Sequence, residues 1–270
     1  MFRKIAPIVF GLSILTLLSC SEFKKIQKSS NNTEKYKAAV AYYQKEDYHR
    51  SLQLLDELMI YYRGNDTSEK INYYYAYCYY GQADYIQAGY YFLKFTDMFP
   101  ASVYSEECLY MSAYCQYLFS PDYSLDQSMS LDAIRQLQYF VDRYPNSSRI
   151  EACNKLIDEI RQKLEMKAFM IAKLYYNTES YQAAVVAFKN LLKEYPDTGH
   201  REEAYFYIVK SSYLYALQSV ESKKGPRLYM AVDAYNAFMT IFPQSKYVKE
   251  VGIIYKNINK EIAKINEQKS

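Results

Sequence analysis

The tetrapeptide Phe99-Pro100-Ala101-Ser102 returns in close variants three more times, and this recurrence determines the architecture that we expect. Counted back from each proline, an aromatic residue or leucine stands five positions earlier, another apolar residue eight earlier and an alanine twelve earlier. A pattern that recurs at fixed offsets predicts an internal structural repeat. The variants are Tyr144-Pro145-Asn146-Ser147, Tyr195-Pro196-Asp197-Thr198 and Phe242-Pro243-Gln244-Ser245. The matching positions are Ala88, Phe92 and Phe95; Ala133, Leu137 and Phe140; Ala184, Phe188 and Leu191; and Ala231, Tyr235 and Phe238.

Each copy of the pattern predicts one amphipathic helix that ends at its proline. The three offsets bring the marked side chains onto one face of a helix. Alanine permits close approach of a neighbouring helix, and proline cannot continue the helical hydrogen bonds. An earlier copy fits the same frame without its proline, at Ser51, Leu55 and Leu58. The motif small-x3-aromatic-x2-apolar-x4-Pro resembles the second half of a tetratricopeptide (TPR) repeat.

The first helix of each expected pair has a small and an aromatic position of its own. We therefore predict an all-α, TPR-type helical solenoid of about five helix pairs, over residues 33–247. Because one such pair cannot bury its apolar face alone, stacking of the pairs supplies the core, and 33–265 should form a single solenoid domain. The small and aromatic positions are Ala39 and Tyr42, Ala76 and Tyr79, and Ala172 and Tyr175.

The spacing of the prolines and glycines refines this outline. Residues 148–176 contain neither proline nor glycine and predict one long helix. Residues 248–265 should form a C-terminal capping helix, with 266–270 as a short tail. The third and fifth pairs carry extra residues around Pro121 and around Gly225-Pro226, which we expect to be insertions between helices.

The first nineteen residues have the organisation of a signal peptide. Arg3 and Lys4 precede an apolar stretch from Ile5 to Leu18. The fourteen residues of this stretch span only about 21 Å as a helix, short of the roughly 30 Å hydrocarbon core of a bilayer. A membrane-spanning helix is therefore not expected there.

The end of this stretch, Leu17-Leu18-Ser19-Cys20, resembles the bacterial lipobox. Cleavage would then remove residues 1–19 and leave Cys20 to carry the lipid. The alternative is an ordinary signal sequence in which Cys20 is incidental. Residues 20–32 are rich in Ser, Asn and Lys, and we predict a flexible linker there.

Charge and motif content argue against nucleic-acid binding and catalysis. The formal net charge of +3 falls to about +1 without Arg3 and Lys4, since 31 basic residues then face 30 acidic ones. Such a balance lacks the basic footprint of a nucleic-acid-binding protein. The sequence has no HExxH, CxxC, GxSxG or phosphate-binding glycine loop, and its two histidines, His49 and His200, are interpreted as surface residues. We expect a non-enzyme without metal or cofactor, apart from the N-terminal lipid.

Four cysteines follow Cys20. Cys108 and Cys115 lie seven residues apart on one predicted helix, which is too far to bridge. Cys78 and Cys115 occupy equivalent repeat positions and are interpreted as small packing residues. A disulfide between repeats stays open as an alternative.

Tyrosine is the outstanding component: the chain has 34 tyrosines and no tryptophan. The groove of a TPR array is lined by first-helix positions three to four residues apart. Tyrosines at these positions of the first three repeats offer apolar area with a polar tip, which suits recognition of an extended peptide. Packing between helices is the competing explanation for about half of them. The predicted groove residues are Tyr36, Tyr43, Tyr73, Tyr77, Tyr80, Tyr110, Tyr114 and Tyr117.

The lipobox, the short linker and the five helix pairs with Tyr/Phe-Pro-x-Ser/Thr endings together resemble the BamD family of outer-membrane assembly lipoproteins. The resemblance runs from Cys20 to about Tyr255. It implies a lipid-anchored protein on the periplasmic face of the outer membrane, which helps to insert β-barrel proteins. It also implies that the amino-terminal repeats bind unfolded barrel segments. The carboxy-terminal repeats, here 168–254, would bind the BamA-type insertase.

Two other functions use a similar scaffold or anchor. A periplasmic TPR coordinator of the Tol or cell-wall machinery usually carries a coiled coil before its repeats and has no lipid, unlike this sequence. A surface glycan-binding lipoprotein of the SusD kind is much longer and uses tryptophan platforms, which are missing here. The sequence therefore favours the assembly function over both.

Overall fold

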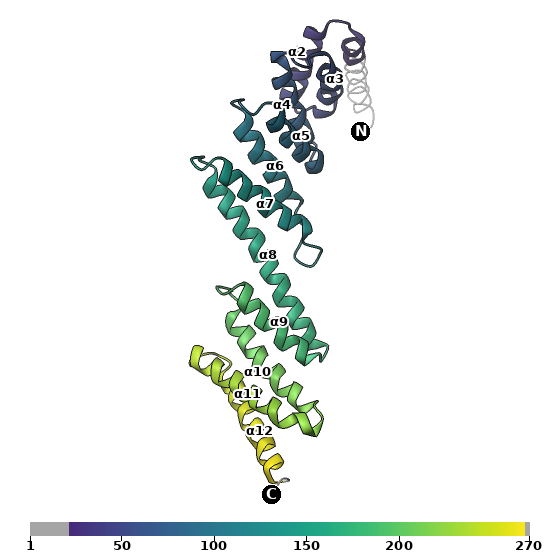
Figure 1. Ribbon diagram of the computed structural model, residues 1–270. Coiled ribbons are helices and arrows are strands. Elements are labelled where there is room, and N and C mark those ends of the chain that lie inside the picture. Colours follow the sequence, from purple (N-terminus) through teal and green to yellow (C-terminus); the bar gives the residue numbers. More distant parts are fainter. Residues whose placement is uncertain (1–21, 268–270) are drawn as a thin grey trace, which may run out of the picture. The chain divides into compact units, whose positions relative to one another are not determined.

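A computed structural model of the chain describes residues 22–267, and all regular secondary structure in this range is helical. The predicted all-α, TPR-type class is confirmed, with helices that pair along the chain (Figure 1). The first helices of the pairs are α2 (Asn32–Gln44), α4 (Asp66–Gly81), α6 (Ser105–Phe119), α8 (Ile150–Asn177) and α10 (Arg201–Leu217). Their partners are α3 (Tyr48–Tyr61), α5 (Tyr85–Met98), α7 (Ser128–Arg143), α9 (Tyr181–Glu194) and α11 (Glu221–Ile241).

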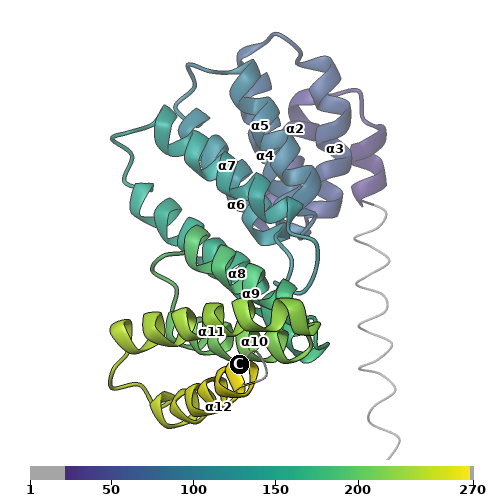
Figure 2. The ribbon, with the colours of Figure 1, turned by 60° about the horizontal axis from the view of Figure 1, so that its bottom comes forward.

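Two further predictions about helices are confirmed. The stretch without proline or glycine forms α8, a single helix, and the capping helix appears as α12 (Val248–Glu267). The last helix packs against α10 and α11 (Figure 2). Pro121 lies, as predicted, in the segment that joins α6 to α7.

The described residues divide into two compact units. The first comprises residues 22–121 and 126–160, and the second comprises 122–125 and 161–267. The boundary falls inside α8, whose beginning belongs to the first unit and whose end belongs to the second. The prediction of a single domain over 33–265 is not tested by this division and stays a prediction.

The repeat frame read from the sequence corresponds closely to the buried core. Of the fifteen marked second-helix positions, only Tyr235 remains partly exposed, while the other side chains are almost fully buried. The small first-helix residues Ala39, Ala76 and Ala172 are also fully buried. The predicted aromatic position at Tyr175 differs, because that ring is 41% exposed. Its neighbour Tyr176 packs instead, with its ring centroid 4.8 Å from that of Tyr207.

The turns inside three pairs share one backbone device. Each contains a non-glycine residue at positive φ: Glu46 at 61°, Ala83 at 59° and Glu179 at 58°. Asp47 and Asp84 follow two of these residues, and their carboxylates accept backbone N–H groups of the next helix at 3.2 Å. The residue in the left-handed conformation lets the chain turn back after the first helix. The aspartate then caps the amino terminus of the second helix.

The serine or threonine of the first three Pro-x-Ser/Thr endings joins consecutive repeats. Its hydroxyl donates to a glutamate on the preceding first helix and accepts the backbone N–H two residues further on. Because this hydroxyl link uses donor and acceptor together, it fixes the start of the next helix to the preceding pair. The donor–acceptor pairs are Ser102–Glu69, Ser147–Glu106 and Thr198–Glu165, each at 2.6 Å.

The amino-terminal linker differs from the prediction. Residues 22–28 are helical, and the side chain of Phe23 is buried against the first repeat. Its ring lies edge-on to Tyr42 at 5.6 Å between centroids, and the Arg50 guanidinium lies 5.7 Å from the centroid of Phe23. Ile26 packs against the same cluster, so two apolar side chains in a polar stretch dock it, and composition alone did not show this. The predicted signal peptide and the lipid site at Cys20 lie outside the described residues.

The predicted insertion at Gly225-Pro226 is wrong, because both residues lie inside α11. The helix starts at Glu221, so Pro226 lies little more than one turn from its beginning. The proline ring keeps the φ angle of a helix, so the chain continues through Pro226 although this residue supplies no N–H to the carbonyl of the preceding turn. The extra residues of the fifth pair therefore lengthen a helix instead of a loop.

The four internal cysteines are buried and unbridged. Burial raises the pKa of the Cys78 and Cys153 thiols to about 11 and that of Cys115 to about 12. These cysteines pack between helices, which agrees with their interpretation as small core residues.

Candidate peptide-binding face

The eight tyrosines predicted to line a groove all lie on the first helices of the first unit. Spacings of three and four residues along α4 and α6 place them on one side of each helix. Every one of these side chains is half-buried, so packing and exposure are both partial. We call this surface the tyrosine face; it comprises Tyr36 and Tyr43 of α2, Tyr73, Tyr77 and Tyr80 of α4, and Tyr110, Tyr114 and Tyr117 of α6.

Glu107 links α4 to α6 across this face. Tyr73 donates to Glu107 Oε2 at 3.3 Å, and Tyr77 donates to Oε1 at 2.6 Å. The two tyrosine rings lie 4.7 Å apart between centroids. Burial, reinforced by the bond to Glu107, holds the pKa of Tyr77 far above its usual range. Both hydroxyls are therefore engaged within the protein, and a ligand would contact the rings of Tyr73 and Tyr77 and not their hydroxyl groups.

Three rings on α6 form a nearly parallel series. Tyr110 and Tyr114 lie 5.9 Å apart with planes 8° apart, and Tyr114 and Tyr117 lie 5.9 Å apart with planes 16° apart. Tyr117 donates to Glu159 of α8 at 2.5 Å. This bond to the carboxylate, together with burial, raises the pKa of Tyr117 to about 12. The series thus ends at a fixed hydroxyl, while flat ring surfaces lie along the helix.

The remaining tyrosines connect α2 and α4 to their neighbours. Tyr43 packs against Tyr74 at 4.9 Å between centroids, and burial raises its pKa to about 12. Tyr80 packs against Tyr85 with 5.7 Å between ring centroids. Burial raises the pKa of Tyr80, and the nearby Tyr114 hydroxyl raises it further. The structure therefore joins the predicted residues of α4 and α6 through Glu107, and those of α2 lie half-buried on the neighbouring helix.

The sequence prediction missed the charged residues on this surface. Glu107 stands three residues before Tyr110, so helical spacing could have placed it on the same stripe. Glu159 and Arg149 come from the start of α8 and the turn before it, and no local pattern tied them to the tyrosines. Arg149 stacks on Tyr110, with its guanidinium carbon 4.7 Å from the ring centroid.

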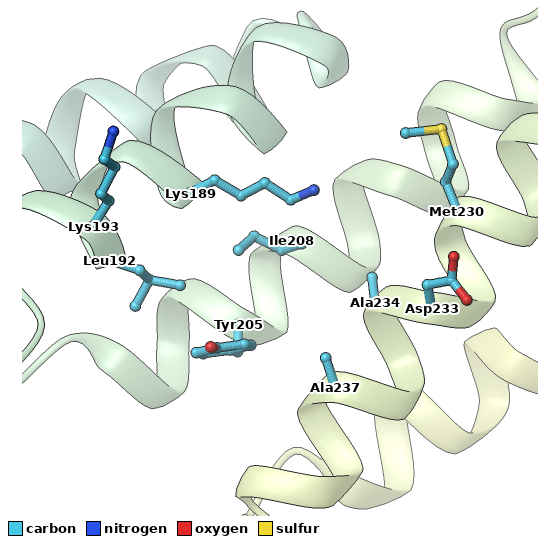
Figure 3. A pocket seen from close by; sticks show the side chains of 9 residues that line it. All are labelled: Lys189, Leu192, Lys193, Tyr205, Ile208, Met230, Asp233, Ala234 and Ala237. Carbon is cyan, nitrogen blue, oxygen red and sulfur yellow. The ribbon is translucent and has the colours of Figure 1, made fainter.

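A second surface of interest lies in the second unit, between α9, α10 and α11. A hollow of about 450 Å³ opens there, and Lys189 of α9 extends over the α10 residue Ile208 toward Met230 and Asp233 of α11 (Figure 3). Lys193 of α9 also lines it. A neighbouring hollow of about 260 Å³ shares Lys189 and Met230, so the two form one groove. We call this the α9–α11 groove; its further residues include Val186, Leu192, Tyr205, Tyr215, Arg227, Ala234 and Ala237.

The α9–α11 groove combines exposed apolar side chains with positive charge. Val186 is 53% exposed and Met230 is 57% exposed. Arg227 stacks on Tyr215 with its guanidinium carbon 3.9 Å from the ring centroid. A groove with an apolar floor and a basic rim suits a partner segment that has apolar anchors beside acidic residues.

The described part of the chain contains neither a metal-binding cluster nor a helix that could span a membrane. No three His, Cys, Asp or Glu side chains there are placed to share a metal ion. Of the helices within residues 22–267, none combines the length and the apolar content needed to cross a bilayer.

Comparison with known proteins gives the family. The profile of the family YfiO, described as "Outer membrane lipoprotein", matches residues 28–228. Outer membrane protein assembly factor BamD of Rickettsia prowazekii is 24% identical over 222 residues, which cover 82% of this chain and 84% of that protein. Its counterpart in Pasteurella multocida is 26% identical over 213 residues, 75% of this chain and 82% of that protein. A putative BamD of Aquifex aeolicus is 25% identical over 215 residues, 77% and 68% of the two chains. Because the profile covers most of its length, the chain belongs to this family of outer membrane lipoproteins.

Proposed function

We propose that this protein is a non-catalytic scaffold that assists the assembly of outer membrane β-barrel proteins. The observation that carries the proposal is the tyrosine face, a set of half-buried aromatic rings on the first helices of three successive repeats, in a chain similar to named assembly factors. The proposed role is to hold an extended segment of an unfolded barrel protein there. Binding and positioning are sufficient for this role, so it needs no cofactor.

The chemistry of the tyrosine face fits an extended apolar segment better than a sugar or a charged polymer. The rings offer flat apolar area at low entropy cost, because a tyrosine side chain has only two rotatable bonds. Those of Tyr73 and Tyr77 are already fixed by Glu107, so they lose little freedom on binding. A barrel strand alternates apolar and polar side chains, and one of its faces can therefore lie on the rings.

The second part of the proposal concerns the insertase partner. The α9–α11 groove lies within the predicted partner-binding repeats, 168–254, and carries the exposed apolar side chains that an interface core requires. We place the BamA-type insertase there, bound through apolar anchors beside acidic residues. Neither the Tol or cell-wall role nor the glycan-binding role is favoured by the relatives, which are all named as assembly factors.

The proposed location follows from the family and from the sequence of the first twenty residues. A lipid on Cys20 would tether the chain to the outer membrane, and multiple acyl chains hold a protein stably in a bilayer. In this proposal the folded repeats face the periplasm, where unfolded barrel proteins pass. The docked helix over residues 22–28 would then bring the first repeat close to the lipid.

The double substitution Tyr80→Ala and Tyr114→Ala tests the tyrosine face. Neither hydroxyl has a hydrogen bond among the residues described, so these changes remove ring surface without stranding a buried partner. Loss of two aromatic contacts of about 1–2 kcal/mol each predicts weakening of peptide binding by roughly 30-fold or more. Fluorescence anisotropy with a labelled barrel-strand peptide measures the affinity.

The control for this experiment removes two tyrosines from second helices. Tyr90 and Tyr139 are 56% and 53% exposed, on α5 and α7. Their replacement by alanine should leave the affinity within about twofold, because surface changes away from a site have small effects. Equal losses in both double variants, with circular dichroism unchanged, would refute the assignment of the site.

The substitution Met230→Glu tests the α9–α11 groove. It places a negative charge at the centre of the groove, where an apolar anchor of the partner would bind. The amount of BamA-type insertase that co-purifies with the protein in mild detergent should therefore fall greatly. Ile253→Glu is the matched control, since Ile253 is 60% exposed on α12 and does not line the groove. Unchanged recovery with Met230→Glu would move the partner interface elsewhere.

A further inference from the structure

Arg149 contributes a positive charge to the tyrosine face that has no ionic partner among the residues described. The residue is half-buried, and its backbone N–H donates to Ser147 Oγ at 3.1 Å. Its guanidinium stacks on the ring of Tyr110 at 4.7 Å. Within residues 22–267 the guanidinium has neither an ion pair nor a hydrogen bond. Because stacking engages only the flat faces of a guanidinium, its edge N–H donors stay available.

Comparison of the repeats shows that stacking alone does not require an arginine. The residue two positions after the Pro-x-Ser/Thr hydroxyl always lies on an aromatic ring of the preceding first helix. Other repeats use an aromatic residue for this contact. The pairs are Tyr104 on Tyr73 at 4.7 Å, His200 on Phe169 at 4.2 Å and Tyr247 on Phe206 at 4.1 Å between centroids. The charge of Arg149 is therefore an addition that the packing does not explain.

The other charges on the tyrosine face would direct an anionic group of a ligand toward Arg149. Glu107 lies between Tyr73 and Tyr77, and Glu159 lies beside Tyr117. Both carboxylates repel an approaching anion. Arg149 stands against Tyr110, at the opposite end of the α6 ring series from Tyr117. An anion at this end would pair with the guanidinium and leave the rest of its chain over the rings.

We propose that Arg149 determines the specificity and the direction of peptide binding, by pairing with a carboxylate of the bound peptide. A guanidinium can hold a carboxylate through two parallel N–H bonds. An aromatic side chain next to that carboxylate would then lie on the rings of Tyr110 and Tyr114. This inference rests on the proposed peptide-binding function. The carboxylate is either the free carboxy terminus of the peptide or an acidic side chain near it.

The experiment compares peptides that differ only in this carboxylate. Each is about ten residues long, the length of one membrane-spanning strand, ends in phenylalanine and lacks Asp and Glu. One has a free carboxy terminus and the other a terminal amide; a third peptide is the amide with a single Asp before the last residue. In anisotropy titrations at low salt, the free acid should bind about tenfold more tightly than the amide, as expected for a charge-assisted bidentate bond.

Arg149→Tyr is the decisive variant, because it keeps the stacked ring that other repeats have at this position. It should reduce the affinity for the free acid to that for the amide and leave the amide unaffected. Arg135→Tyr is the control: Arg135 lies on α7, is paired with Asp132, and should change neither affinity. Circular dichroism checks that both variants keep their helices.

The outcomes separate this inference from the proposed function. If the wild type binds acid and amide equally, and Arg149→Tyr changes neither affinity, the role of Arg149 is refuted while peptide binding stands. If only the Asp-containing amide depends on Arg149, the residue pairs with an acidic side chain, and the proposal holds for that source. If no peptide binds to the wild type, both the proposed function and this inference are refuted.

Discussion

Phe92→Ala is expected to lower the free energy of unfolding by about 3–5 kcal/mol, the range for truncation of a fully buried phenylalanine. Phe92 is completely buried in the first unit, beside Ala76, Ala88 and Cys115. Its ring lies edge-on to Tyr77 with 4.8 Å between centroids. Alanine would leave a cavity, and the better helix propensity of alanine recovers only about 0.5 kcal/mol of the loss. Since domains are stable by only about 5–15 kcal/mol, this change approaches the whole margin.

Urea denaturation followed by circular dichroism measures the loss. Phe119→Ala removes the same side chain from α6, where it is 43% exposed, and should cost much less, about 1 kcal/mol or below. Phe92→Leu should fall between the two, because it keeps most of the volume. Similar losses for Phe92→Ala and Phe119→Ala would mean that the repeat frame does not mark the core. Phe92→Ala should also weaken peptide binding at temperatures where the variant stays folded, because it removes the support under Tyr77.

At alkaline pH the protein is expected to unfold cooperatively between about pH 10 and pH 12. The pKa values of Tyr43 and Tyr117 are raised to about 12 from an ordinary value of 10.0, the first by burial and the second by its bond to Glu159 and by burial. The pKa values of Tyr75 and Tyr77 are raised further, mainly by burial. In this window the folded state binds more protons than the unfolded state, so stability is complete below pH 10 and falls as the pH rises.

The measurement follows tyrosinate absorbance and far-UV circular dichroism together. The tyrosines whose pKa values are raised, Tyr43, Tyr75, Tyr77 and Tyr117, form the buried class. The buried class should ionise only as helical structure is lost. Tyr43→Phe should shift this transition to higher pH, whereas Tyr90→Phe should not. Titration of all tyrosines near pH 10 in an intact helical protein would contradict the packing described for the tyrosine face.

The sequence was sufficient to predict the helix pairs, because one periodic pattern specifies both burial and termination. Ala88, Phe92 and Phe95 are buried for the reason their offsets suggest, and Phe99 ends α5 where the proline follows. The prediction failed at Gly225-Pro226, since one proline removes a single helical N–H bond without ending α11, which continues to Ile241. It also failed at Phe23, because docking of a short segment depends on a tertiary contact that no local periodicity reports.

The candidate site was predictable only in part. Helical spacing put the tyrosines on one stripe, yet it gave no information about which hydroxyls find partners on a neighbouring helix. Glu159 accepts from Tyr117 across 42 positions of sequence, and Arg149 reaches Tyr110 from a turn. Such pairings arise from the stacking of repeats and cannot be read from one segment.

The hydroxyl links also show how tolerant the repeat is to changes in its length. Ser102 and Thr198 lie 33 residues from their glutamates, whereas Ser147 lies 41 residues from Glu106, a difference of eight. All three bonds nevertheless have the same length, and five of the eight additional residues lie in the segment between α6 and α7, which has eight residues where the segment between α4 and α5 has three. A repeat of this type can therefore gain a short loop there without losing its register with the next one. In this chain the connection between α6 and α7 is therefore a place where length can change while the stacking of the repeats is kept.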